Sequence, residues 1–100
     1  MKANLKLDIP TLEFAAKKIR VLTHPDRLKL IKLLDGNEKL NVTKIYEKLH
    51  FVQAHTSFNL GILKEYGIVK KVRQGKMSIY SLDREVLDKI LQVCEELSRR

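Results

Sequence analysis

Two segments near the N-terminus carry apolar positions at helical spacing. Residues 10–22 intersperse apolar side chains with lysine and arginine in a pattern that predicts a helix with one apolar and one basic face. A second helix is predicted to open at Pro25 and to run to a turn at residues 35–37. His24 precedes that proline, where a side chain is more often a hydrogen-bond partner of the first helical turn than a metal ligand.

The middle of the chain predicts two short helices that follow each other closely. Asn41 or Thr43 is placed to cap a third helix that ends near Leu49. A fourth helix is predicted between residues 52 and 66, followed by Gly67 at a position typical of a helix C-terminus. Two helices joined so closely are typical of a helix-turn-helix. The inward stripe of the fourth helix is predicted to consist of Val52, Thr56, Leu60 and Leu63.

The last third of the chain changes from helical to strand periodicity and back. Residues 68–73 and 77–82 carry Val, Ile and Tyr at two-residue intervals around a turn at residues 74–76, which predicts a β-hairpin. Asp83 is placed to cap a final helix with an apolar seam. The whole pattern indicates a mainly α fold, a winged helix-turn-helix of about five helices with a two-stranded hairpin as its wing.

Composition narrows the classes of function. A chain of 100 residues has room for one domain, in which we expect residues 1–9 to be flexible, and its net charge of +8 favours phosphate-rich partners. Cys94 is the only cysteine, so an internal disulfide and a thiolate metal site are excluded and a reducing cytoplasm is expected. Secretion and a membrane partner are not expected, because no segment has the apolar length that either requires.

One stretch of the chain is distinguished by its lack of charge. From Leu49 to Leu63 there is no Asp, Glu, Lys or Arg, although 32% of all residues are charged. A helical projection turns a small, uncharged face outward there, which suits close approach to the major groove of double-stranded DNA. The residues predicted to read base edges are Gln53, His55, Thr56, Ser57, Phe58 and Asn59.

Basic side chains follow directly after this stretch. Glu65 is the only acidic residue between residues 64 and 76, and the cations there are predicted to contact DNA phosphates: Lys64, Lys70, Lys71, Arg73 and Lys76. The competing interpretation is a core helix beside a solvated hairpin edge that its lysines keep from pairing with other strands. Helix order, charge gap and basic hairpin coincide, and together they favour contact with DNA.

Four stretches resemble one known family. The chain is similar to the ArsR/SmtB-type winged-helix repressors over residues 10–98, in the segments HPDRLKLIKLL, LNVTKIYEKL, VQAHTSFNLGILKEYGIV and VRQGKMSIYSL. The resemblance implies a homodimer that binds inverted-repeat operator DNA and represses transcription, with its first and last helices at the dimer interface. On the apolar seams of those helices the expected interface residues are Phe14, Ile19, Leu87, Ile90, Leu91 and Cys94.

The sequence departs from the family where its metal-sensing members bind their ions. Residues 40–44 carry no thiol in place of the family's Cys-x-Cys pair, and residues 83–98 contain no histidine. The carboxylates left on the last helix make a poor transition-metal site. We therefore expect no metal site, no cofactor and no specific response to zinc, cadmium or arsenite. Asn59 and Gly61 stand where the family often has His and Lys, so the operator sequence cannot be copied from a relative.

Two other functions stay open on the sequence. A protein-docking adaptor would use the uncharged helix as a contact patch around Phe58 and Ile62. A regulator gated by oxidation of Cys94, or by a small ligand in an apolar pocket, is the other, although a small buried side chain is the simpler interpretation of this cysteine. An enzyme is not expected, because the chain lacks nucleophile, phosphate-loop and paired-carboxylate motifs.

Overall fold

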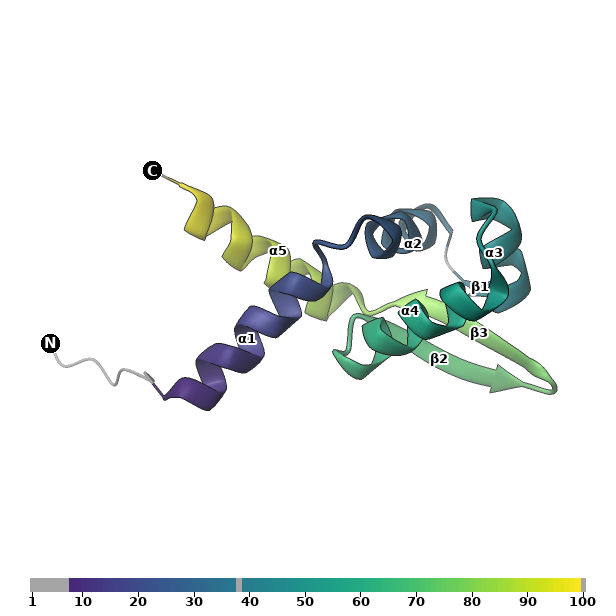
Figure 1. Cartoon of the computed structure of the whole chain (residues 1–100), viewed down its shortest axis with the longest axis horizontal. Helices are drawn as coiled ribbons and strands as arrows, with labels where there is room; N and C mark the ends of the chain where they lie inside the picture. The colour runs from purple at the N-terminus through teal and green to yellow at the C-terminus, as the bar shows by residue number, and fades with distance from the viewer. Residues whose placement is uncertain (1–7, 38, 100) are drawn as a thin grey trace, which may run out of the picture.

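The predicted order of helices and strands is confirmed. A computed structural model describes residues 8–37 and 39–99 of the chain. Along the chain lie α1 (Ile9–Val21), α2 (Pro25–Gly36), β1 (Leu40–Asn41), α3 (Val42–Leu49), α4 (Gln53–Glu65), β2 (Val69–Gln74), β3 (Met77–Leu82) and α5 (Arg84–Ser98). This is a winged helix-turn-helix in which β2 and β3 form the wing (Figure 1).

Local side-chain caps explain where the helices begin. Nδ1 of His24 accepts the backbone N–H of Asp26 at 3.1 Å, as its position before Pro25 predicts. Asn41, rather than Thr43, caps α3 through an Oδ1 that accepts a backbone N–H at 2.8 Å. Asp83 caps α5 in the same way. Each cap satisfies a donor that the first turn of a helix leaves without an intrahelical partner.

The first helix begins earlier than the sequence pattern indicates. Residues 1–7, where flexibility is expected, lie outside the described residues. Asp8 is ordered as the N-cap of α1, because its Oδ2 accepts both the hydroxyl and the backbone N–H of Thr11, at 2.6 and 3.1 Å. These hydrogen bonds, the hydroxyl first, lower the pKa of the Asp8 carboxyl. The structure thus places residues 8 and 9 at the start of α1.

The sheet has three strands, in the order β1-β3-β2, and not the two predicted. Strand β1 pairs antiparallel with β3, Leu40 opposite Tyr80. Its two residues are too short to show strand alternation, so the sequence carried no signal for it. At the tip of the wing, Gly75 occupies a positive φ of 61° between the paired residues Gln74 and Met77. A glycine meets the backbone requirement of such a two-residue turn without strain.

One core joins the helix-turn-helix to the wing. Its fully buried apolar side chains come from α2, α3, α4 and the residue just before β2: Leu30, Ile45, Leu60, Leu63 and Ile68. Val52 does not join them and is 72% exposed. Its backbone is extended at the N-cap of α4, so helical spacing does not apply to it and its predicted place on the inward stripe is wrong.

Two helices extend beyond this core. Figure 1 shows α1 and α5 crossing next to the body of the molecule and then diverging from each other on the side away from the wing. The molecule is accordingly elongated, measuring 54 by 29 by 22 Å along its principal axes. In the part of the chain that the structure describes, no helix has the length and apolar character needed to cross a bilayer.

Candidate nucleic-acid interface

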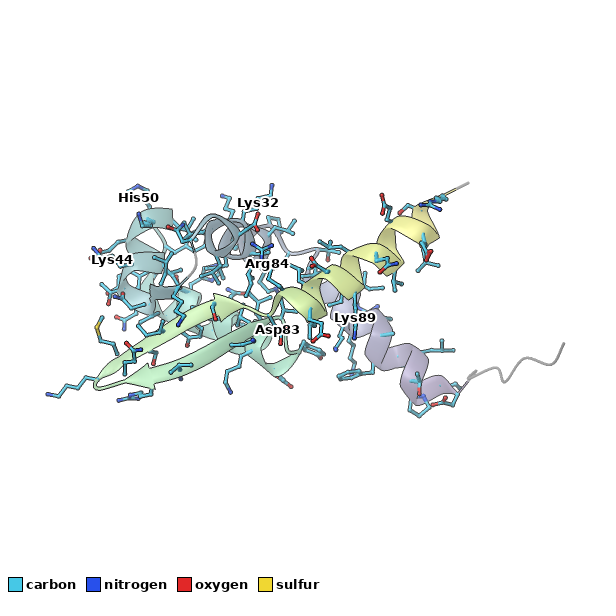
Figure 2. All side chains as sticks on the ribbon, turned by 180° about the vertical axis from the view of Figure 1, so that it is seen from behind. Lys32, Lys44, His50, Asp83, Arg84 and Lys89 are labelled. Atoms are coloured by element: carbon cyan, nitrogen blue, oxygen red, sulfur yellow. The ribbon has the colours of Figure 1, made fainter. Side chains whose placement is uncertain are left out.

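A tight turn sets α4 across α3. His50 ends α3 in the left-handed conformation, with φ 57° and ψ 39°, and α4 starts three residues later. A non-glycine residue tolerates this conformation best when it is Asn, Asp or His. Figure 2 shows His50 at the surface, at the end of α3. Its role is to shape the turn between the two helices.

The outer face of α4, formed by Ala54, Ser57, Phe58 and Gly61, lies free at the surface of the protomer. Phe58 is 67% exposed although it is a large aromatic residue. A Cβ added at Gly61 would meet no atom within 4 Å, so packing inside the protein does not require glycine there. Gln53, in the first turn of the same helix, is exposed as well. The face is therefore flat, uncharged and accessible.

Two predicted base-reading residues lie inside the protein instead. Asn59 is 3% exposed, and its Nδ2 donates to the backbone carbonyl of His55 at 2.9 Å. Thr56 is fully buried, and its hydroxyl donates to the carbonyl of Val52 at 3.1 Å. Both side chains donate hydrogen bonds to backbone carbonyls four residues earlier in the chain. They are packing residues, and their place among the predicted reading residues is corrected.

His55 is held at the edge of the outer face by a partner from α2. Its Nε2 lies 2.7 Å from Oδ2 of Asp26, and both side chains are partly exposed. The ring of Phe51 meets the imidazole edge-on, with centroids 5.5 Å apart. This contact fixes the start of α4 against the start of α2. The sequence gives no signal for it, because the two residues stand 29 positions apart.

The basic residues of the wing divide between its two faces. Lys71 pairs with the buried Tyr80 and Arg73 with Ser78, so both cations share the sheet face that carries the core. Lys70 points to the opposite face, because side chains alternate along a strand. Nε of Arg73 donates to the carbonyl of Gly75 at 3.2 Å, which draws its guanidinium toward the turn. Lys64, at the end of α4, and Lys76, in the turn, are exposed.

Exposed apolar side chains concentrate on the two projecting helices. Leu91 is 52% exposed and Phe14 54%, while Ile19, Ile90 and Cys94 are half-buried. Leu87 is an exception among the predicted interface residues, since it is 5% exposed and belongs to the core of its own protomer. The first turns of α5 still lie on the body, and only later turns leave it. Burial within the protomer corrects the expectation for Leu87.

Metal-binding side chains do not gather anywhere in residues 8–37 and 39–99. No three His, Cys, Asp or Glu residues of these ranges lie close enough together to hold an ion. The hydroxyl of Tyr80 lies on a buried side chain, and burial raises its pKa above the usual value. Tyr80 is thus a packing residue of the sheet.

Known proteins share this chain's sequence and fold, although no model of a known family matches it. It is 34% identical to an uncharacterized HTH-type transcriptional regulator of Methanocaldococcus jannaschii, over 85% of this chain and 96% of that one. It is 30% identical to the transcriptional repressor PagR of Bacillus anthracis over 88% of both chains, and the crystal structure of PagR superposes with a TM-score of 0.70, covering 87% of this chain and 99% of that one.

A solution structure extends the likeness of fold. The homodimeric winged helix-turn-helix DNA-binding domain of a possible ArsR-family regulator from Mycobacterium bovis is 22% identical, covers all of this chain and 94% of its own, and has a TM-score of 0.76. Relatives and fold together indicate a non-enzymatic regulator. This chain belongs to the HTH-type transcriptional regulators, and its fold is that of a winged helix-turn-helix DNA-binding domain.

Proposed function

We propose that this protein is a homodimeric repressor that binds an inverted-repeat operator in double-stranded DNA and acts in the cytoplasm. The observation that carries the proposal is the outer face of α4, which is accessible, free of charge and flanked by cations. Neutral polar side chains on such a face can match base edges in the major groove, an exposed Phe58 can touch a thymine methyl, and the flanking cations can meet phosphates.

The side chains of the proposed DNA interface divide into one set that reads bases and one set that contacts phosphates. Gln53, His55, Ser57 and Phe58 remain as base-reading candidates, since each has exposed or partly exposed atoms on or beside the outer face. Phosphate contacts are assigned to Lys64, Lys71, Arg73 and Lys76. Lys70 lies on the other face of the wing from Arg73, so we expect it to contribute less.

Dimerisation rests on the projecting helices. Exposed leucines along α5 and the apolar residues of α1 would be covered by the same surfaces of a second copy, as a two-fold axis requires. PagR is called a repressor and the Mycobacterium bovis domain is called homodimeric. Both properties support the same assignment here.

Two single substitutions in the wing distinguish the loss of a phosphate contact from the loss of one positive charge alone. Arg73→Ala is expected to weaken binding to every duplex and to lower the slope of log K against log salt by about one unit, because it removes one phosphate contact. Lys70→Ala removes the same charge from the opposite face and should leave the slope closer to that of the wild type. Fluorescence anisotropy across a salt series measures both. Equal slopes for Arg73→Ala and wild type would remove Arg73 from the interface.

Gly61→Ala is expected to raise the stability of the fold and to lower the affinity for operator DNA. Alanine in place of an exposed helical glycine is expected to stabilise the fold by about 0.5–1 kcal/mol. The added methyl group faces the groove, where overpacking costs about 1–3 kcal/mol of operator affinity. Thermal unfolding and operator titration of the same preparation test this. A variant that is more stable and binds DNA as well as wild type shows that α4 does not approach the bases at Gly61.

The structure weakens the adaptor alternative. Ile62 is half-buried and packs against the core, which leaves Phe58 as the only large apolar residue on the outer face. A single exposed phenylalanine is an ordinary surface feature and does not make a docking patch.

A further inference from the structure

A basic pocket lies where α1 ends and α2 begins. Its cavity of about 430 Å³ is lined by Lys17, Arg20 and Arg27 together with Val21 and Tyr66. The pocket is open to solvent. The pocket belongs neither to the outer face of α4 nor to the seam of α5.

Nothing in the described protein neutralises its three cations. Neither of the two ion pairs found among residues 8–37 and 39–99 involves Lys17, Arg20 or Arg27. The Nε of Arg27 is buried and has no hydrogen-bond partner within those ranges. A buried donor without a partner is costly, and a guanidinium donor more so.

The position of Arg27 on its helix makes the arrangement still less favourable. Arg27 is the third residue of α2, and the positive end of a helix dipole disfavours a cation in the first turn. Arg20, by contrast, stands in the last turn of α1, where the dipole favours it. Helix polarity thus favours Arg20 at its position but not Arg27.

Two lining residues of the pocket make contacts within the protein. The ring of Tyr66 packs against that of Phe14, with centroids 5.7 Å apart, and Val21 is buried. The predicted interface residue Phe14 therefore makes a contact within its own protomer. A planar guanidinium fork suits bidentate recognition of an oxyanion, and two of the lining cations are arginines.

We propose that Lys17, Arg20 and Arg27 bind a phosphate group in this pocket. The group comes either from a free phosphate-bearing small molecule or from the backbone of DNA. The proposal depends on the proposed function only for the second source, so its failure can be told apart from a failure to bind operator DNA.

Titration with inorganic phosphate at constant ionic strength, followed by amide chemical shifts, tests the pocket itself. Wild type should saturate, and Arg20→Gln should raise the Kd about tenfold or more, as the loss of one charged hydrogen bond does. Arg27→Gln should also raise the Kd for phosphate. Arg20 is exposed, so Arg20→Gln is expected to fold and still tests the pocket if Arg27→Gln does not fold. The matched control is Lys32→Gln on the far surface of α2 (Figure 2), which removes the same charge and should leave the Kd unchanged.

A salt series with a random duplex distinguishes the two sources. If DNA supplies the phosphate, Arg20→Gln lowers the slope of log K against log salt by about one unit and Lys32→Gln does not. If a free ligand supplies it, phosphate saturates the pocket while the slope stays that of wild type. The proposal is overturned if phosphate shifts are unsaturable, or equal in wild type and Arg20→Gln, and the DNA slope is also unchanged.

Discussion

Leu91→Glu is expected to dissociate the dimer while leaving each protomer folded. Leu91 is 52% exposed in the protomer, so a carboxylate there costs the isolated fold little. In the dimer the same carboxylate would be buried against apolar side chains without a partner, which costs several kcal/mol. We expect the Kd of the dimer to rise by about 100-fold or more, or ~2.7 kcal/mol. Operator affinity should fall with it, since a monomer holds one half-site only.

Gln92→Glu is the matched control for this change. Gln92 is exposed and stands one residue further along α5, turned by about 100° from Leu91 in a helix. The Gln92→Glu variant adds the same charge at a position away from the apolar seam of α5, so we expect this variant to remain a dimer. Sedimentation velocity at several concentrations measures both variants. A Leu91→Glu protein that sediments as an unchanged dimer places the interface elsewhere.

Ser57→Glu is expected to abolish operator binding without unfolding the protein. Ser57 is exposed at the centre of the outer face of α4, and glutamate is a better helix former than serine. Against DNA, a carboxylate meets phosphates and base acceptors, and like-charge contact of this kind costs several kcal/mol. We expect a loss of affinity of about 100-fold or more, or ~2.7 kcal/mol, at low salt.

Lys32→Gln gives the control for net charge, because it also lowers the charge of the protein by one. Lys32 lies at the surface of α2 on the side away from the wing (Figure 2). Its effect on affinity should be small and equal for operator and scrambled duplexes. Unchanged operator affinity in Ser57→Glu, with an unchanged melting temperature, would show that α4 does not face DNA.

Local chemistry explains why so much of the fold was predictable. The starts of α2, α3 and α5 depend on His24, Asn41 and Asp83, whose caps act within three residues along the chain. The inward positions Leu60 and Leu63 and the outward positions of α4 follow from helical spacing alone. Such signals survive in a single sequence because both partners of each interaction lie close together in it.

Features that depend on distant residues could not be predicted. Strand β1 forms by pairing with the edge of β3, about 40 residues away. The side chain of His55 contacts that of Asp26, 29 residues earlier in the chain. Leu87 lies on the predicted seam, but only the structure shows how far the core reaches along α5. Thr56 and Asn59 are different, because helical spacing places Thr56 on the inward stripe and Asn59 about 40° from Leu63, in agreement with their burial.

Selection of bound sequences from a random duplex library tests whether a dimer of this protein reads DNA, because the enriched sequence depends on both the outer face of α4 and the two-fold dimer. Wild-type protein is expected to enrich an inverted repeat whose half-sites lie about 10 base pairs apart, or a multiple of that, as symmetric recognition helices require. Ser57→Ala should enrich a relaxed version of the same repeat. Enrichment of no sequence, or of a single unrepeated site, would contradict the account of a dimeric regulator that reads DNA through α4.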